Sequence, residues 1–127
     1  MSLARIDTGK RGEDIAVSYL KKQGYKIIEK NYKTLQGEID IIGSHRGCVC
    51  FVEVRARNTR RFGLPEDSIN RKKQTRIAKV ALSYIKRFGL EEENCRFDVV
   101  SVESVNSISP KLKLIRNAFE LVDQYKY

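Results

Sequence analysis

Apolar residues recur at helical spacing in two segments of this chain. In residues 9–24 they make one stripe, which Gly24 would end: Ile15, Ala16, Tyr19 and Leu20. The second segment runs from Pro65, a residue suited to the first turn of a helix, to Gly89, which would end it. Its apolar face comprises Ile69, Ile77, Val80, Ala81, Tyr84, Ile85 and Phe88. We therefore predict two amphipathic helices.

Other segments are rich in β-branched and aromatic residues or alternate in polarity, as strands do. They are residues 25–32, 37–43, 48–57, 96–103 and 111–115. Residues 117–124 are expected to form a short final helix or an irregular tail. The chain is thus predicted to be one α/β domain over residues 1–127, with a mixed central sheet of about five strands flanked by helices, in the order αβββαββ with a short C-terminal helix. The helix between the third and fourth strands implies a parallel pair in that sheet.

Two acids occupy strands that the pattern pairs with each other. If Arg46 and Gly47 form the turn, Asp40 falls opposite Glu53, and a slip by one residue would place Asp40 among the valines. Cross-strand neighbours have Cβ atoms about 4.5–5.5 Å apart, where two carboxylates repel unless one is protonated or a cation lies between them. Arg55, two residues after Glu53, faces the same way. This pattern favours a divalent cation site, because Mg²⁺ prefers such oxygen ligands.

The same residues allow simpler roles. Asp40 and Glu53 could lie on a half-exposed sheet face, with Arg55 making an ordinary ion pair. Glu38 shares the face of Asp40 and could be a further acid of the site or a salt-bridge partner. Glu13, taken alone, fits a solvated helix residue, but it could add a third carboxylate, directly or through water, if its helix packs beside the sheet edge.

The remaining residues with reactive side chains favour structural roles. Asp98, inside a valine-rich strand, is expected to pair with Arg96. The three cysteines are expected to be small core residues of a reducing compartment rather than a disulfide framework: Cys48, Cys50 and Cys95. His45 lies near two of them, but the spacing fits no common zinc pattern.

Charge points to a polyanionic partner. The chain has 25 Lys and Arg against 16 Asp and Glu, a net charge of +9. Nucleic acid, above all DNA, is the expected partner, and the basic residues nearest the acids and on the second helix are the expected contacts: Arg55, Arg57, Arg71, Lys72, Lys73 and Arg76. No run approaches the roughly 18 apolar residues of a membrane span, so we expect no membrane partner and a cytoplasmic protein.

Several motifs, in order and spacing, resemble the YraN-like family of uncharacterised bacterial proteins. The resemblance covers nearly the whole chain and is carried by the segments beginning Gly9-Lys10-Arg11-Gly12-Glu13, Gly37-Glu38-Ile39-Asp40, Phe51-Val52-Glu53-Val54-Arg55, Arg96-Phe97-Asp98 and Asn117-Ala118-Phe119. That family resembles the PD-(D/E)-x-K nuclease superfamily, with its restriction-endonuclease-like fold, and is most similar to archaeal Holliday junction resolvases.

The resemblance implies a role for each matching residue. Asp40 and Glu53 would be the metal-binding acids, the Val54 carbonyl a further ligand, and Glu13 an acid contributed by the first helix. The cofactor would be Mg²⁺ or Mn²⁺. Arg55 departs from the superfamily pattern, since lysine usually stands there. Junction resolvases of this fold act as dimers, so a homodimer is implied by analogy.

Three functional hypotheses follow. The leading one is a divalent-metal-dependent endonuclease acting on DNA, including branched or damaged DNA, in which Arg55 binds the scissile phosphate. The alternative is a catalytically inactive nucleic-acid-binding module with a nuclease fold, in which Arg55 reports the loss of catalysis. The third is an interaction protein that docks an acidic partner.

Overall fold

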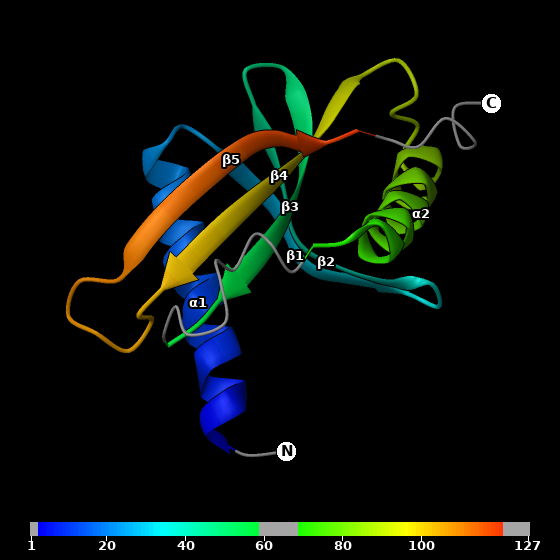
Figure 1. The fold of residues 1–127 in the computed structure, drawn as a ribbon. Helices are drawn as coiled ribbons and strands as arrows, with labels where there is room; N and C mark the ends of the chain where they lie inside the picture. Colours follow the sequence, from blue (N-terminus) through cyan, green and yellow to red (C-terminus); the bar gives the residue numbers. More distant parts are fainter. Residues whose placement is uncertain (1–2, 59–68, 121–127) are drawn as a thin grey trace.

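Five strands form one sheet whose order in space follows the order in sequence, β1-β2-β3-β4-β5. The computed structural model describes residues 3–58 and 69–120, with side chains from residue 8 onward (Figure 1). The elements are α1 (Leu3–Lys22), β1 (Lys26–Thr34), β2 (Gly37–His45), β3 (Cys48–Ala56), α2 (Arg71–Arg87), β4 (Asn94–Glu103) and β5 (Lys111–Phe119). The predicted α/β class, element order and mixed sheet are confirmed.

Three of the strand pairs are antiparallel, and one is parallel. The parallel pair is β3 with β4, where the chain crosses over through α2. This confirms the predicted parallel pairing, because a tight turn can join only antiparallel neighbours. Such a crossover leaves room for a helix to lie on a face of the sheet.

The β2–β3 hairpin has the predicted turn and register. Arg46 and Gly47 have φ of 51° and 76°, as a two-residue turn of the favoured hand requires. Gly43 then pairs with Cys50, and the pairing continues to Ile41 and Val52. It ends there, one position before Asp40 and Glu53. The two strands therefore separate where the candidate acids begin.

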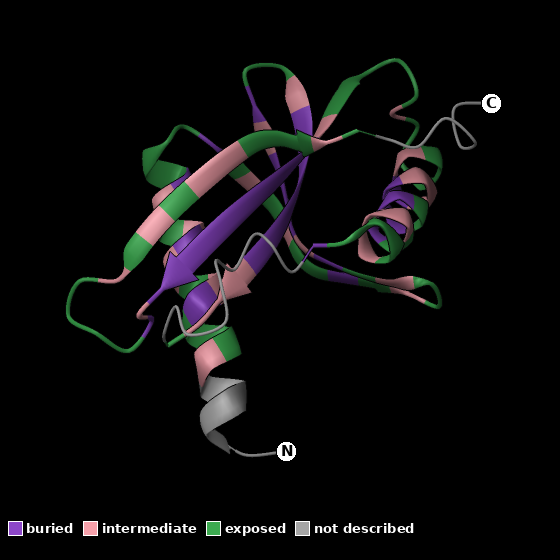
Figure 2. Ribbon diagram, viewed as in Figure 1, coloured by how far each residue is buried: buried purple, intermediate pink, exposed green. Residues whose placement is uncertain are grey.

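Each helix covers one face of the sheet. On α1, Ala16 and Leu20 pack against alternate residues of β3 such as Val52. On α2, Ile77 and Tyr84 belong to a second cluster on the opposite face, with members Ile42, Phe51 and Phe97. The inner strand β4 is buried along most of its length, whereas the edge strand β5 is exposed or half-buried throughout (Figure 2). Because β4 lies inside the sheet, its polar residues Asp98, Ser101 and Glu103 are buried along with its valines.

One carboxylate, that of Asp98, is fully enclosed in the core. Its side chain is 0% exposed and accepts hydrogen bonds from Arg96 Nε (2.9 Å), the Tyr25 hydroxyl (2.7 Å) and the Asn117 backbone N–H (2.9 Å). The predicted pairing with Arg96 is confirmed. His45 stacks on Tyr25 and contacts Arg96 through Nδ1, so its buried ring belongs to this network.

Both helices begin elsewhere than predicted. Helix α1 begins at Leu3 rather than near Gly9, because one glycine in an exposed helical segment costs only about 1 kcal/mol and does not set a boundary. Helix α2 begins at Arg71, since the Asn70 side chain caps it by accepting a hydrogen bond from the Lys73 N–H. The predicted start at Pro65 is therefore wrong; Pro65 itself lies outside the described residues.

Three smaller predictions also need correction. Phe88, placed on the buried face of the second helix, is 48% exposed because it follows the last helical turn. Cys95 is exposed near the start of β4, whereas Cys50 is buried as predicted and Cys48 is half-buried. Residues 117–119 belong to β5 rather than to a final helix, and residues 121–127 lie outside the described part of the chain.

Neither helix in the described residues combines the length and the apolar character that crossing a bilayer would require.

Close contact between α1 and β3 depends on Gly12. A Cβ atom built on this buried glycine would overlap the Cβ of Ala56. The absence of a side chain lets α1 approach the end of β3, and the next residue, Glu13, is thereby brought to the point where β2 and β3 separate. A glycine that permits such an approach is specified by packing rather than by helix propensity.

We predict that Gly12→Ala destabilises the protein by about 1–3 kcal/mol, because the added methyl group overpacks the α1–β3 contact. Gly9→Ala on the same helix is the matched control, since no atom of the described residues lies within 4 Å of its added Cβ. That variant should gain up to about 1 kcal/mol from helix propensity. Urea denaturation measures both changes, and equal stability of the two variants would contradict the prediction.

Candidate active site

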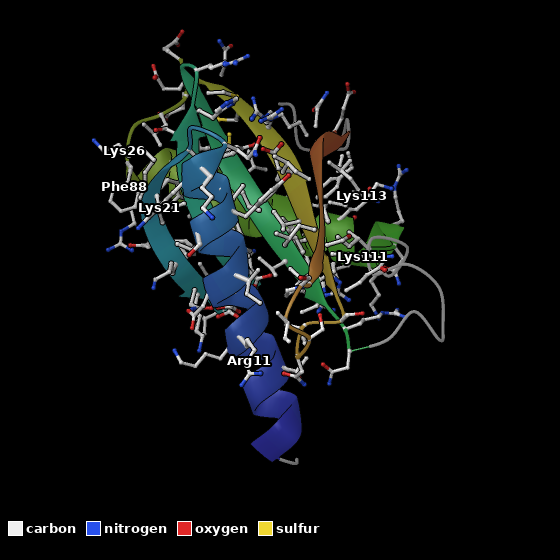
Figure 3. The ribbon with its side chains drawn as sticks, turned by 90° about the vertical axis from the view of Figure 1, so that its left-hand side faces the viewer. Arg11, Lys21, Lys26, Phe88, Lys111 and Lys113 are labelled. Atoms are coloured by element: carbon white, nitrogen blue, oxygen red, sulfur yellow. The ribbon has the colours of Figure 1, made fainter. Side chains whose placement is uncertain are left out.

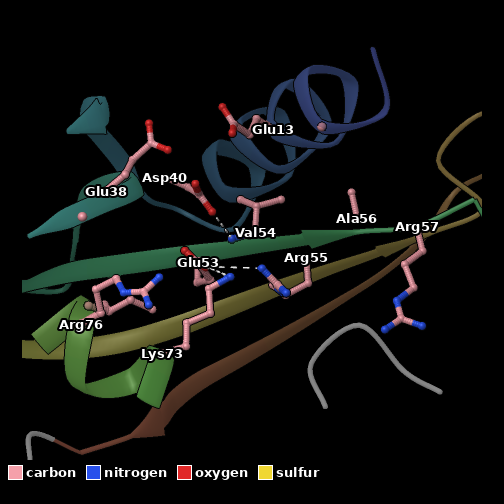
Figure 4. Close-up of a pocket in the computed structure, with 13 residues that line it drawn as sticks. Glu13, Glu38, Asp40, Glu53, Val54, Arg55, Ala56, Arg57, Lys73 and Arg76 are labelled. Atoms are coloured by element: carbon pink, nitrogen blue, oxygen red, sulfur yellow. Dashed lines mark hydrogen bonds and ion pairs between the residues drawn. The ribbon is translucent and has the colours of Figure 1, made fainter. Parts of the chain in front are cut away.

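A cleft of about 440 Å³ lies between α1, α2 and the diverging ends of β2 and β3 (Figure 4). Acidic and basic side chains both line it. The acids are Glu13, Glu38, Asp40 and Glu53, and the bases are Arg55, Arg57, Lys73 and Arg76. The lining is completed by Gly9, Gly37, Val54, Ala56 and Ile77. Residues from four separate elements or their flanks thus form one polar cavity.

Glu53 is the most enclosed acid of the cleft. Alternation along β3 directs it to the face covered by α2, where it is only 6% exposed. Two cations approach its Oε2 atom: Lys73 Nζ at 3.2 Å and Arg55 Nη1 at 3.5 Å. Figure 4 shows both side chains directed toward Glu53 from different elements. The carboxylate is therefore held between a residue of its own strand and a residue of α2.

The side chain of Asp40 replaces a backbone hydrogen bond where the pairing of β2 and β3 has ended. Its Oδ2 atom accepts a hydrogen bond from the Val54 N–H at 2.8 Å, just beyond the last backbone pair of β2 and β3. The N–H and C=O of one strand residue face the same neighbour, so the Val54 carbonyl also lies on the Asp40 side. Three oxygen-bearing groups, those of Asp40, Glu53 and Val54, consequently meet at this point.

Glu13 reaches the same cleft from α1. Its half-buried side chain lies on the side of Asp40 away from β3 (Figure 4). Burial raises the pKa of Glu13, and the nearby carboxylates of Glu38, Asp14 and Glu53 act in the same direction, while a hydrogen bond with Asn31 opposes them. An isolated solvated role for Glu13 does not fit this position.

Negative charge is crowded around Asp40. Burial raises its pKa to about 8, and the neighbouring Glu53 and Glu13 carboxylates add to the increase, whereas the Val54 N–H lowers it. An aspartate ordinarily loses its proton near pH 4. The cleft therefore favours either a proton or a bound cation at this carboxylate near neutral pH.

Protein side chains supply only part of the ligand set that a hard divalent cation needs. Within the described residues, no group of three or more His, Cys, Asp and Glu side chains is arranged to hold a metal ion. Mg²⁺, however, is commonly held by one or two carboxylates together with water and substrate phosphate oxygens. Asp40 and Glu53, with the Val54 carbonyl, match that smaller requirement. Lys73 and Arg55 already offset part of the charge on Glu53.

The structure brings together most of the predicted site residues. Asp40, Glu53, Val54, Arg55 and Glu13 share the cleft. Of the predicted basic contacts, Arg57, Lys73 and Arg76 line it as well, whereas Lys72 lines an adjacent hollow. Arg71 is exposed at the start of α2 and lines neither cavity.

Glu38, whose role the sequence left open, lines the cleft and also pairs with Lys33 at 3.9 Å. Two other features of the cleft escaped the sequence pattern. Gly9 and Gly37 also line the cleft, and nothing in their local sequence indicated it. The ion pair between Lys73 and Glu53 joins segments far apart in the chain, which spacing along one strand or helix does not reveal.

Positive charge is not confined to the cleft. Arg11, Lys21, Lys111 and Lys113 project from the side of the molecule formed by α1 and β5 (Figure 3). The cleft differs from this surface because its cations stand beside four acids in a concave site.

Comparison with known proteins gives a consistent family match. The model of a family described as "Uncharacterised protein family UPF0102" matches residues 12–102. The chain is 44% identical to a UPF0102 protein of Syntrophus aciditrophicus over 116 residues, which is 91% of each chain. It is 43% identical to one of Thermodesulfovibrio yellowstonii, over 92% of this chain and 99% of the relative. The resemblance to YraN-like proteins, whose family this is, is confirmed.

We predict that Asp40 makes the protein less stable as the pH rises. A carboxyl group whose pKa is higher in the folded than in the unfolded state contributes most below pH 4, and its contribution is lost as the pH rises toward 8. The loss is at most about 1.4 kcal/mol per pH unit. In metal-free buffer, Asp40→Asn should therefore be more stable than the wild type at pH 8, with a shallower pH dependence.

Urea denaturation between pH 4 and 8 measures this difference. Asp14→Asn is the control, because Asp14 is exposed on α1 and pairs only loosely with Lys10 at 4.0 Å. It should change stability by no more than about 0.5 kcal/mol. Parallel pH profiles for the wild type and Asp40→Asn would contradict the assignment.

Proposed function

This chain belongs to the UPF0102 family, and we propose that it is a divalent-metal-dependent endonuclease that hydrolyses phosphodiester bonds of DNA, including branched or damaged DNA. The observation that supports this proposal most directly is the cleft itself, in which four acids stand beside four cationic side chains. Acids able to bind a metal and cations able to bind phosphate are the two requirements of metal-assisted phosphodiester hydrolysis. The net charge of +9 favours a polyanionic substrate.

In this proposal the acids hold the cofactor. Asp40, Glu53 and the Val54 carbonyl would bind Mg²⁺ or Mn²⁺, and Glu13 would contribute a third carboxylate directly or through water. A divalent cation in such a site supplies Lewis acidity toward the phosphate and activates water for attack. The Val54 N–H orients Asp40 through its 2.8 Å hydrogen bond, so the backbone of β3 positions the ligand.

The basic residues bind and orient the substrate. Arg55 is directed into the cleft by its contact with Glu53, and its guanidinium can bind the scissile phosphate and stabilise the charge that develops there. It cannot act as a general base, since guanidinium stays protonated near neutral pH. Arg57 and Arg76 line the cleft on different elements and can bind flanking phosphates.

We predict that Asp40→Asn and Glu53→Gln reduce cleavage below roughly 1% of the wild-type rate, because each removes a metal-binding charge. The assay incubates protein with linear, nicked and four-way-junction DNA in Mg²⁺ or Mn²⁺. EDTA should abolish cleavage, and Asp14→Asn should leave it unchanged. Wild-type protein without activity on all three DNAs, or undiminished activity in the two variants, would refute the proposal.

Thermal denaturation supplies a readout that does not depend on turnover. Bound metal should raise the Tm of the wild type, because a ligand present at 100 times its Kd stabilises a protein by about 2.7 kcal/mol. Asp40→Asn should lose most of this shift.

One observation favours a second candidate, a nucleic-acid-binding module without catalysis. Glu53 already has two cationic partners, Lys73 and Arg55, so the cleft can reach partial charge balance without a metal ion. Arg55 also stands where related nucleases carry lysine. Under this alternative, DNA binding requires no metal and no cleavage occurs.

We predict for this module that DNA binding in EDTA weakens steeply as salt increases. Replacing Arg71, Lys72 and Lys73 by Ala should make the slope of log K against log salt shallower by roughly two to three, if all three contact phosphates. The control with the same net charge is the triple variant Lys21→Ala, Lys22→Ala and Lys111→Ala, on other surfaces. Fluorescence anisotropy over a salt series measures the slopes, and identical slopes for both triple variants would exclude the α2 face as the binding surface.

A further inference from the structure

The turn of the β1–β2 hairpin lies beside the first half of α2. Figure 1 shows this hairpin extending past the rest of the sheet, under the helix. Gly37, the first residue after the turn, has φ of 149°, and a Cβ built on it would lie 3.0 Å from Arg76 Cγ. The glycine thus permits both the backbone conformation and the close approach to α2. Its contact with Arg76 fixes the position of the hairpin relative to the helix.

A second hollow, of about 410 Å³, lies between this turn and α2. Within the described residues, its lining contains three cations and no acid: Gln36, Lys72, Thr75, Arg76 and Lys79. Arg76 also lines the cleft that contains Asp40 and Glu53 (the acidic cleft), so the two cavities adjoin at this side chain. A chain that occupied the cleft could continue into the hollow, where the described residues would offer it positive charge and hydrogen-bonding groups.

An exposed leucine forms the tip of the hairpin. Leu35 and Gln36 make a two-residue turn, and Leu35 has a relative exposure of 108%. Hairpin turns of this length strongly favour Asn, Asp or Gly, because the preferred types need positive φ; neither residue has it. Leu35 is therefore neither favoured by the turn conformation nor buried in the core. An apolar side chain next to a cationic hollow suits the two parts of a nucleic acid. The apolar side chain can pack on the face of a base, and the cations can bind the anionic backbone.

We propose that this second hollow binds the phosphate backbone of the nucleic acid strand that leaves the acidic cleft, and that Leu35 packs against the face of an unpaired base beside it. The substrate class is then DNA in which a duplex meets unpaired bases, as at a fork or branch. This inference rests on the proposed function for the nature of the chain in the cleft. It adds a binding site and a structural preference that the cleft alone does not specify.

The test compares two DNAs of the same sequence, a fork with unpaired arms and a blunt duplex, in EDTA so that binding is measured without cleavage. The wild type should bind the fork more tightly. Leu35→Ser should reduce the ratio of fork to duplex affinity roughly tenfold, as expected from the loss of one buried leucine side chain, while duplex affinity stays nearly constant. A 2-aminopurine base at the fork should lose its protein-induced fluorescence change in the same variant.

The matched control is Ile108→Ser. Ile108 is 103% exposed in the β4–β5 loop, which Figure 1 places at the opposite side of the molecule from the β1–β2 turn. It should not change the affinity ratio. The double variant Lys72→Ala and Lys79→Ala should weaken binding to both DNAs and make the salt slope shallower by about two, whereas Lys21→Ala with Lys111→Ala should not.

Two results would overturn the inference. One is an unchanged affinity ratio in Leu35→Ser. The other is a change of oligomeric state in that variant, measured by light scattering, with DNA binding intact, which would make the tip a contact between copies of this chain. Absence of cleavage by the wild type, together with a fork preference that depends on Leu35, would refute the nuclease but support the binding site. Metal-dependent cleavage without that preference would support the nuclease but refute the binding site.

Discussion

The hydrogen bond from the Val54 N–H to the Asp40 carboxylate marks the point on which the candidate site depends. Backbone pairing between β2 and β3 ends at Ile41 and Val52, and the side chain of Asp40 then satisfies a donor that the ladder would otherwise have bonded. Because the strands diverge there, space opens between the two helices. One interaction thus ends the pairing, orients an acid and leaves the neighbouring Val54 carbonyl turned toward the same opening.

Charge balance in this opening is incomplete, and its source is visible in the contacts. Glu53 is compensated by Lys73 and Arg55. Among the described residues, the Val54 N–H stabilises the charged form of Asp40, yet burial raises the pKa of this carboxyl group to about 8. Asp98 provides the contrast within the same protein. It is more deeply buried, yet Arg96, Tyr25 and the Asn117 N–H satisfy it. Asp98 has a full set of partners, whereas the described residues form no ion pair with Asp40, a contrast that is more typical of a functional than of a structural carboxylate.

A second cavity adjoins the cleft that holds the acids. Arg76 stands between the acidic cleft and the cationic hollow, and its contact with Gly37 ties the β1–β2 hairpin to α2. Two polar cavities therefore adjoin at Arg76: the cleft, which is lined by both acids and cations, and the hollow, whose described lining contains cations without acids.

Local sequence predicted the elements whose signals are local. The turn at Arg46 and Gly47 and the alternation along β2 and β3 were enough to set the hairpin register, because a one-residue slip would expose the apolar face. The same alternation placed Glu53 and Arg55 together, and the parallel β3–β4 pair followed from the helix between them. Helix starts were less well determined, since Asn70 caps α2 by a contact that competes with the apolar pattern beginning at Ile69.

The candidate acids came from the sequence, with Glu13 assigned to the site by family resemblance, whereas their environment came from tertiary structure. No pattern along one element shows that Lys73 of α2 contacts Glu53 or that Gly12 lets α1 approach Ala56. Neither does it show that Arg76 lines two cavities. These features depend on distances between segments that are remote in the chain, and those distances are set by how the helices pack on the two faces of the sheet. The sequence by itself determined which side chains are available for chemistry; packing decided which of them meet, and with how much uncompensated charge.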